Sequence, residues 1–161
     1  MMERKDSRPS WDETFLDVAD VMARRSACFR SKVAAVIVRD GKHVVSTGYN
    51  GPPPHQKNCM EIGSCYRIEH GITSGTELER CRASGCHAER NAINIAAKLG
   101  ISTSGTTMYV IGANFICDEC QGSIDVAGIT RVVLRDKNGN VFEFIPSRDW
   151  TVHPVDRENE P

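Results

Sequence analysis

The sequence predicts a three-layer α/β domain built around a mixed sheet of five strands. Its 161 residues fit a single domain, and a chain this long can bury a core without disulfides. Hydrophobic residues make up 40% and charged residues 25%, as in ordinary globular proteins. After an initial hairpin, strand-like apolar runs alternate with helix-like stretches, which is the pattern of a sheet covered by helices.

The first expected element is a helix that opens on Ser10-Trp11-Asp12-Glu13. The serine and the glutamate have the spacing of a capping box, in which each side chain binds the other residue's backbone N–H. Apolar residues then recur at helical spacing at Trp11, Phe15, Val18, Ala19 and Met22. We expect this helix to run to about Cys28 with one apolar face.

A buried hairpin follows the first helix. Residues 33–38 form a continuous apolar run, Asp40-Gly41 is a turn sequence, and residues 43–47 are the returning strand. The run Pro52-Pro53-Pro54 ends the hairpin, because proline cannot continue a strand ladder.

Residues 55–86 show no clean periodicity and carry four of the seven cysteines. An unstructured loop of this length is uncommon in a compact domain. We therefore interpret 55–86 as a cysteine-bearing insert. Because it has no periodic hydrophobic face, another kind of interaction must order it.

The second half of the chain alternates helices and strands. We expect a helix over 87–99, a strand over 106–111, a helix over 118–126, and strands over 130–135 and 141–145. Residues 146–161 form a polar tail, expected to be partly disordered or packed on a partner subunit. Short connections place the helix starts beside strand ends, where sites usually lie in such folds.

Charge and hydropathy exclude several classes of protein. Lys and Arg total 20 against 21 for Asp and Glu, so a nucleic acid is not expected as a partner. A small phosphorylated ligand is still compatible, because it needs only one or two cations. No apolar stretch approaches ~20 residues, and the charged start Met1–Asp6 is not that of a secretory signal. We expect a cytoplasmic protein without a membrane partner.

The chemistry is concentrated at two predicted helix starts, Cys86-His87-Ala88-Glu89 and Cys117-Asp118-Glu119-Cys120. In a reducing compartment, metal ligation explains cysteines better than disulfides. Two thiolates and one imidazole make a zinc site with an open position, the catalytic arrangement. Such a metal lowers the pKa of a bound water towards ~7, and Glu89 is the carboxylate beside it that could move protons.

Each part of this pattern has a plainer interpretation. Cys117 and Cys120 could be a thioredoxin-like redox pair, although Asp118 and Glu119 would oppose thiolate formation. His87 and Glu89 could be a helix-capping pair with a solvated carboxylate. A non-catalytic zinc scaffold that binds nucleotides is a further alternative, and Glu89 argues against it because a structural site gains nothing from that carboxylate.

His-x-Glu followed by Cys-x-x-Cys is the signature of zinc nucleobase deaminases. Residues 10–135 resemble the deoxycytidylate (dCMP) deaminases of the cytidine deaminase-like superfamily. The further shared segments are Arg25-Ser26-x-Cys28, Lys32-Val33-x-Ala35-Val36-Ile37-Val38, Ser46-Thr47-Gly48-Tyr49-Asn50-Gly51, Ser74-Gly75 and Ala127-Gly128-Ile129.

The resemblance implies a cytidine deaminase-like α/β/α fold and the hydrolysis of dCMP to dUMP and ammonia. It implies that His87, Cys117 and Cys120 hold the catalytic zinc and that Glu89 shuttles protons. It also implies that Asn50 hydrogen-bonds the deoxyribose. A basic residue after the first helix, Arg25 or Arg30, would hold the phosphate, the alternative being an ordinary solvated helix end.

Other implied features concern the insert and the assembly. Cys28, Cys59, Cys65 and Cys81 match cysteines of similar proteins, some of which hold a second, structural zinc there; the alternative is four free thiols. Cys86 receives no role. By resemblance the chain is also expected to be a homo-oligomer, a hexamer, switched on by dCTP and off by dTTP, with magnesium bound to the regulatory nucleotide.

One segment departs from the family pattern. The usual Pro-Cys-x-x-Cys is replaced by Ile116-Cys117, the loop 112–116 is longer than usual, and Gln121-Gly122-Ser123 follows the motif. Phe115 in this loop either stacks on the base or plugs the core. Because of this departure, the same deamination reaction on a different substrate, a modified cytosine nucleotide or a free base, is an alternative. A riboflavin-pathway deaminase and a tRNA adenosine deaminase are disfavoured, the first by the lack of a following reductase domain, the second by neutral charge and the insert.

Overall fold

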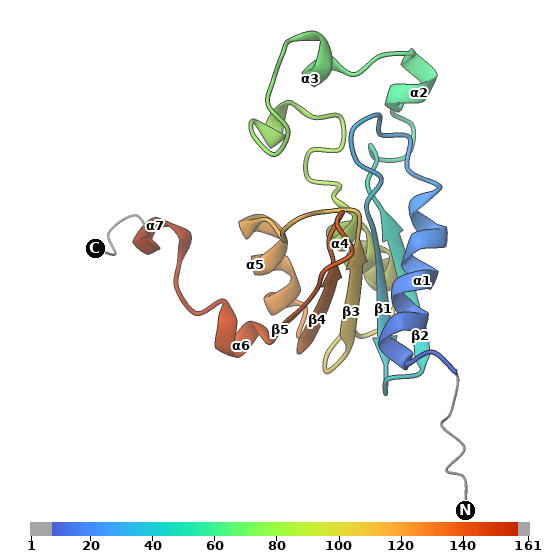
Figure 1. The fold of residues 1–161 in the computed structure, drawn as a ribbon, viewed down its shortest axis with the longest axis vertical. Helices are drawn as coiled ribbons and strands as arrows, with labels where there is room; N and C mark the ends of the chain where they lie inside the picture. The colour runs from blue at the N-terminus through green and yellow to red at the C-terminus, as the bar shows by residue number, and fades with distance from the viewer. Residues whose placement is uncertain (1–7, 158–161) are drawn as a thin grey trace, which may run out of the picture.

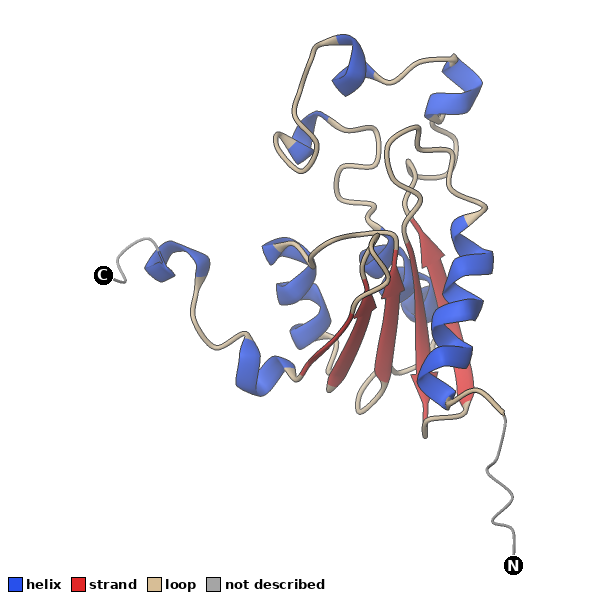
Figure 2. Cartoon of the chain, in the orientation of Figure 1, coloured by secondary structure: helices blue, strands red, loops and turns tan. Residues whose placement is uncertain are grey.

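A computed structural model describes residues 8–157. The charged segment Met1–Asp6 and the last residues of the polar tail, 158–161, lie outside the described residues. The strands form one five-stranded sheet in the order β2-β1-β3-β4-β5 (Figures 1 and 2). Their bounds are β1 Ala34–Arg39, β2 His43–Tyr49, β3 Thr107–Ile111, β4 Arg131–Arg135 and β5 Val141–Phe144. Only β3 and β4 pair in parallel within this sheet, so the predicted mixed sheet of five strands is confirmed.

Helices cover both faces of the sheet (Figure 1). Helix α1 (Trp11–Ala23) packs Phe15, Leu16 and Ala19 on one face, whereas α4 (Ala88–Lys98) and α5 (Asp118–Val126) cover the other. Each face has its own cluster of buried side chains, because alternate strand residues point to opposite faces. The predicted three-layer α/β/α architecture is confirmed.

Helix α1 begins as predicted but ends earlier. The capping box is present, with the backbone N–H of Ser10 donating to Glu13 Oε2 at 2.7 Å and that of Glu13 to Ser10 Oγ at 3.2 Å. The prediction that the helix runs to about Cys28 is wrong, because the last helical residue is Ala23. The Ser26 hydroxyl donates instead to Asn50 Oδ1 at 2.6 Å, which draws the chain towards the end of β2.

Strand β2 lies unusually close to α4. A Cβ atom added at Gly48 would stand 2.4 Å from both the Ala88 carbonyl oxygen and the Ala92 backbone nitrogen. Only glycine permits this approach. The hydroxyl of Ser46 donates to the Ala92 carbonyl at 2.9 Å on the same face. The first turns of α4 are thereby fixed against the sheet.

The insert lies beyond one end of the sheet (Figure 1). It contains α2 (Cys59–Ile62), α3 (Tyr66–Glu69) and a 3₁₀ turn, Leu78–Arg80. Its buried residues are Cys65, Arg67, Ile72 and Ala83, and none of them belongs to either core cluster. The insert is thus ordered without a hydrophobic core shared with the sheet.

The polar tail packs on its own chain as far as the structure describes it. Helices α6 (Pro146–Asp149) and α7 (Pro154–Arg157) follow β5, and Trp150 lies against Phe144 with ring centroids 5.8 Å apart. Arg157 forms an ion pair with Asp118 at the start of α5 at 3.0 Å. No helix within residues 8–157 has the length and apolarity needed to cross a bilayer.

Candidate metal centre and active site

Several chain segments meet at the end of the sheet that the insert faces. The segment before β1, the residues after β2, β3 and β4, and the first residues of α4 and α5 all lie there. In open α/β sheets, ligands bind in the crevice outside the carboxyl ends of the strands. The fold therefore brings together the parts of the sequence that carry chemistry.

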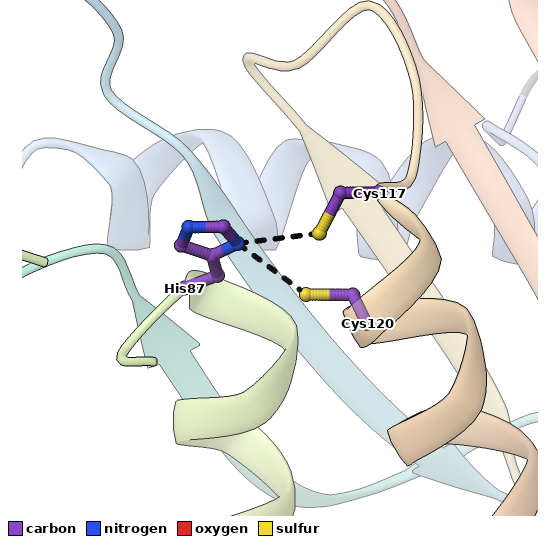
Figure 3. A group of neighbouring side chains, drawn as sticks. All are labelled: His87, Cys117 and Cys120. Atoms are coloured by element: carbon purple, nitrogen blue, oxygen red, sulfur yellow. Dashed lines mark hydrogen bonds between the residues drawn. The ribbon is translucent and has the colours of Figure 1, made fainter. Parts of the chain in front are cut away.

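His87, Cys117 and Cys120 converge at this end (Figure 3). The Nδ1 atom of His87 lies 3.4 Å from the sulfur of Cys117 and 3.5 Å from that of Cys120. His87 is the N-cap residue of α4 and Cys117 that of α5, yet neither side chain makes a capping hydrogen bond. Both side chains point towards each other instead. The alternative of a helix-capping histidine therefore does not hold.

The electrostatics favour an anionic sulfur in this group. Hydrogen bonds from Cys120 and His87 lower the pKa of Cys117 to about 4, against the cost of burial. The hydrogen bond with Cys117 in turn raises the pKa of His87. The start of α5 adds its positive dipole end to the same effect. One nitrogen and two sulfur donors, all within 4.8 Å of one another, suit a zinc ion with three protein ligands.

Glu89 is buried beside this group. Its side chain is 4% exposed, so the alternative of a solvated carboxylate does not hold either. Burial raises the pKa of Glu89 above its ordinary value, because the charged form loses its hydration. A buried carboxyl group whose pKa is shifted towards neutrality can both accept and donate a proton.

Asn91 positions the start of α4, and the sequence analysis did not identify it. Its Nδ2 donates to the carbonyls of Tyr49 at 2.8 Å and Cys86 at 3.0 Å, linking the end of β2 to the residue before His87. Asparagine is a poor residue inside a helix. An asparagine in the first turns of a helix is therefore a signal that could have suggested such a link.

A cavity of about 300 Å³ opens onto the metal centre. Its volume is at the lower end of the ~300–1,000 Å³ typical of small-molecule sites. Its walls include His87, Glu89, Cys117 and Asn50. Five cationic side chains line it as well, namely Arg30, Arg67, Arg80, Arg82 and Lys137. Among the described residues of its lining Glu89 is the one carboxylate, so the cavity suits an anionic ligand.

The residues expected to bind sugar and phosphate lie in different places. The Asn50 side chain lines the cavity and accepts from the Val33 N–H at 2.9 Å, while its Nδ2 donates to the Ser31 carbonyl at 2.9 Å. Asn50 thus holds the segment before β1. Arg30 lines the cavity, whereas Arg25 is exposed and outside its lining.

The loop that departs from the family pattern forms one wall of the cavity. Phe115 is 55% exposed and faces the insert, with its ring 3.9 Å from the position of a Cβ added at Gly75. The alternative that Phe115 plugs the core is therefore wrong. Ile116, 4% exposed, fills that place, and Gln121 Nε2 donates to its carbonyl at 2.8 Å. Helix α5 continues through Gly122 despite its low helix propensity.

The four cysteines expected to form a second metal site line the same cavity. Burial, and then the neighbouring thiols of Cys65, Cys28 and Cys81, raise the pKa of Cys59 to about 11. The backbone N–H groups of Arg30 and Ser31 donate to the Cys28 sulfur at 3.4 and 3.5 Å. In the part of the chain that the structure describes, the four sulfurs are less tightly grouped than the ligand atoms of His87, Cys117 and Cys120.

Fold and site together define a class of protein. A histidine and two cysteines at the starts of two helices, with a buried glutamate beside them on a three-layer α/β fold, are the features of zinc-dependent nucleobase deaminases. Residues 9–135 match the family model described as the cytidine and deoxycytidylate deaminase zinc-binding region, and the chain belongs to this family.

Individual relatives agree with the family. The deoxycytidylate deaminase of Mycobacterium phage D29 is 40% identical over 130 residues, covering 79% of this chain and 95% of that protein. The deoxycytidylate deaminase of Schizosaccharomyces pombe is 37% identical over 126 residues, covering 78% of this chain but only 37% of that longer protein. The structure of a dCMP deaminase from cyanophage S-TIM5 in complex with dCMP and dUMP matches with a TM-score of 0.60 and 27% identity, over 80% of this chain and 83% of that one.

Proposed function

We propose that this chain is a zinc-dependent hydrolase that converts dCMP to dUMP and ammonia. The observation that carries the proposal is the buried Glu89 beside His87, Cys117 and Cys120 in a cavity with cationic walls. The names of the relatives and the nucleotides in the cyanophage structure support the choice of substrate.

In this proposal His87, Cys117 and Cys120 hold the zinc ion. When bound there, zinc supplies an activated water at neutral pH. Glu89 would accept a proton from the attacking water and deliver it to N3 of the cytosine ring while the C4–O bond forms. Glu89 would then carry the second proton of the water to the amino nitrogen on C4. The C4–N bond breaks, ammonia leaves, and uracil remains.

Polar groups around the cavity would bind the rest of the nucleotide. Arg30 Nη1 is buried and has no hydrogen-bond partner, so a phosphate oxygen would satisfy it. Charge-assisted bonds of this kind contribute ~1.5–3 kcal/mol each. Asn50 would reach the deoxyribose from the cavity wall, and the exposed ring of Phe115 would stack on the base.

We also propose a second, structural zinc held by Cys28, Cys59, Cys65 and Cys81. Three observations support this second site. All four cysteines line one cavity, and the other three thiols contribute to the raised pKa of Cys59. Two backbone N–H groups also donate to the sulfur of Cys28. Four thiolates form a closed tetrahedral site, and such sites order segments that cannot fold alone. The insert, which contributes no residue to either core cluster of the sheet, is a segment of that kind.

The cellular setting follows from the same proposal. We assign the enzyme to the cytoplasm, because its seven free thiols fit a reducing compartment and its substrate is a phosphorylated metabolite. A homo-oligomer, the hexamer, and control by dCTP and dTTP with magnesium stay predictions from the family.

A turnover assay of the zinc-loaded protein tests the function. The panel is dCMP, deoxycytidine, dCTP, a 5-substituted dCMP and guanine, and we expect the highest kcat/KM for dCMP. A preference for the 5-substituted nucleotide or for guanine would keep the reaction and change the substrate. No turnover of any of them would indicate the non-catalytic zinc scaffold.

A further inference from the structure

We infer that Arg67 of the insert and Arg30 together form a clamp for the 5′-phosphate of a nucleoside monophosphate. The inference rests on the proposed function and gives a role to Arg67, which no motif in the sequence marks. Its starting point is a pair of atoms. Arg30 Nη1 and Arg67 Nε are the buried side-chain nitrogens without a hydrogen-bond partner among the residues that the structure describes.

Unpaired buried donors are rare in folded proteins and call for an explanation. Here both arginines line the same cavity, the one that opens onto His87 and Glu89. Neither arginine belongs to an ion pair within residues 8–157. A ligand in the cavity that carries several acceptor oxygens and negative charge would satisfy both groups.

Arg67 is held in a fixed orientation. Its side chain is 7% exposed, and its Nη2 donates to the carbonyls of Thr73 and Thr76 within the insert. These bonds hold one edge of the planar guanidinium and leave Nε without an acceptor. A guanidinium that is already oriented loses little conformational freedom on binding, which favours recognition of a phosphate.

The two arginines are also joined to each other. Arg30 Nη2 donates to the Arg67 carbonyl at 3.2 Å, although the residues lie 37 positions apart. Each follows a cysteine of the proposed structural zinc site by two positions, in Cys28-Phe29-Arg30 and in Cys65-Tyr66-Arg67. The segment before β1 and the insert therefore contribute one arginine each to the same wall, and a phosphate bound between them would bridge the two segments.

The other cations of the lining are occupied differently. Arg80 donates to Glu77 and to the Tyr66 hydroxyl and is about half exposed, so solvent and its partners already satisfy it. Arg82 is exposed, and Lys137 donates to the Ser31 hydroxyl. Only the pair of Arg30 and Arg67 combines burial with unused donors among the described residues, which is why we assign the phosphate to it.

The test compares substrates with and without the phosphate. We would measure kcat/KM for dCMP and deoxycytidine in the wild type, Arg67→Gln, Arg67→Lys and the control Arg80→Gln. We expect the dCMP-to-deoxycytidine ratio to fall at least tenfold in Arg67→Gln and severalfold in Arg67→Lys, which lacks the planar fork. The ratio should stay at the wild-type value in Arg80→Gln. In the Arg67 variants kcat/KM for deoxycytidine should fall much less than kcat/KM for dCMP, because deoxycytidine has no phosphate to lose.

Other outcomes would overturn the clamp. An equal loss with both substrates would make Arg67 a structural residue of the insert. An equal fall of the ratio in Arg80→Gln would replace the clamp by diffuse positive charge. If Arg67→Gln does not fold, the folded Arg67→Lys decides, and an unchanged ratio there contradicts the inference.

A binding measurement separates the clamp from the proposed function. Calorimetric titration of the zinc-loaded protein with dUMP and with deoxyuridine reads phosphate recognition without turnover. Tighter binding of dUMP that Arg67→Gln abolishes would support the clamp even in a protein that deaminates nothing. Equal affinities in the wild type would refute the clamp while leaving a deaminase of nucleosides intact.

Discussion

The two cysteine-bearing regions of this molecule are built in opposite ways. His87, Cys117 and Cys120 stand at the starts of α4 and α5, and both helices are packed on the sheet through buried residues such as Ala92 and Ile124. The insert consists of short helical turns joined by loops and contributes no residue to either core cluster. In the first region the packed helices hold the metal-ligating side chains in place. In the second region, metal binding by the cysteines would have to order the chain.

Because of this difference, we expect the first region to carry the reaction and the second to contribute to substrate binding. A preorganised centre on regular elements can hold reacting groups within the tolerance that chemistry needs. A segment ordered by metal ligation has fewer packing contacts and is therefore more sensitive to the loss of a single ligand. Damage to the first region should stop the reaction, whereas damage to the second should weaken substrate binding and leave the metal centre standing.

The largest effect is expected at Glu89, beside His87, Cys117 and Cys120 at the starts of α4 and α5. Glu89→Gln should lower kcat by ~10²–10⁴, because glutamine has nearly the same shape and cannot carry the proton. Zinc content by elemental analysis and the melting temperature should stay at wild-type values. The control is Glu119→Gln, an exposed carboxylate of α5 that pairs with Arg90. Activity of Glu89→Gln within a few-fold of the wild type would remove Glu89 from the mechanism.

The second largest effect is expected in the insert, at the proposed second zinc site. Replacing Cys59 and Cys81 together by serine should remove the second zinc and leave the first in place. Hydrogen exchange should then rise sharply over residues 55–86 while α4 and α5 stay protected. The matched control is Cys86→Ser, which changes a cysteine outside both ligand sets. An unchanged zinc content in the double variant would show four free thiols, the alternative considered from the sequence.

A smaller effect is expected at Arg30, in the wall of the cavity. Arg30→Ala should lower the ratio of kcat/KM for dCMP to that for deoxycytidine about tenfold, the equivalent of ~1.4 kcal/mol. Arg25→Ala, at the exposed position outside the cavity lining, serves as the control. A ratio that falls only in the Arg25 variant would move the phosphate site to the end of the first helix.

The smallest effect concerns the end of the sheet opposite the cavity, where the Arg131 guanidinium beside Asp12 lowers the pKa of that carboxyl. The ion pair stabilises the fold at pH values above the unfolded pKa of ~3.9, and the stabilisation is lost as the pH falls through the lower folded value. Asp12 is 40% exposed, so solvent screening limits the loss in Asp12→Asn to ~1 kcal/mol at neutral pH.

Urea unfolding between pH 7 and pH 3 measures this loss. The curves of wild type and Asp12→Asn should converge at the acid end, with kcat/KM unchanged in the variant. Asp20→Asn, an exposed residue of the same helix, is the control. A constant difference at all pH values would mean that Asp12 acts through packing.

The structure brings together His87, Cys117 and Cys120, which the sequence marks by two local signals. His87-Ala88-Glu89 and Cys117-Asp118-Glu119-Cys120 are each short motifs at the start of a predicted helix, and capping and periodicity near each motif predict that helix. The predicted end of α1 is wrong because no glycine or proline follows Ala23 before Gly41 to mark a helix end, while the Ser26 hydroxyl bonds to Asn50 from another part of the chain.

The insert was less accessible to prediction for a related reason. One of its elements does have a local signal, since Asn58 and Glu61 form a capping box at the start of α2. The burial of Arg67 has none, because it depends on the path of the loop over 70–77 and on carbonyls that any residue could supply. A charged residue in a stretch without periodicity gives no sign that it is buried.

Gly112, directly after β3, has a consequence for any attempt to engineer a new substrate range. A Cβ atom there would lie 2.0 Å from the Lys32 carbonyl oxygen, and the backbone already has a φ of +82°. Two walls of the cavity therefore touch backbone to backbone at this point and cannot be separated by a side chain. Libraries that widen the cavity should leave position 112 alone and vary Phe115 and the insert residues that face it.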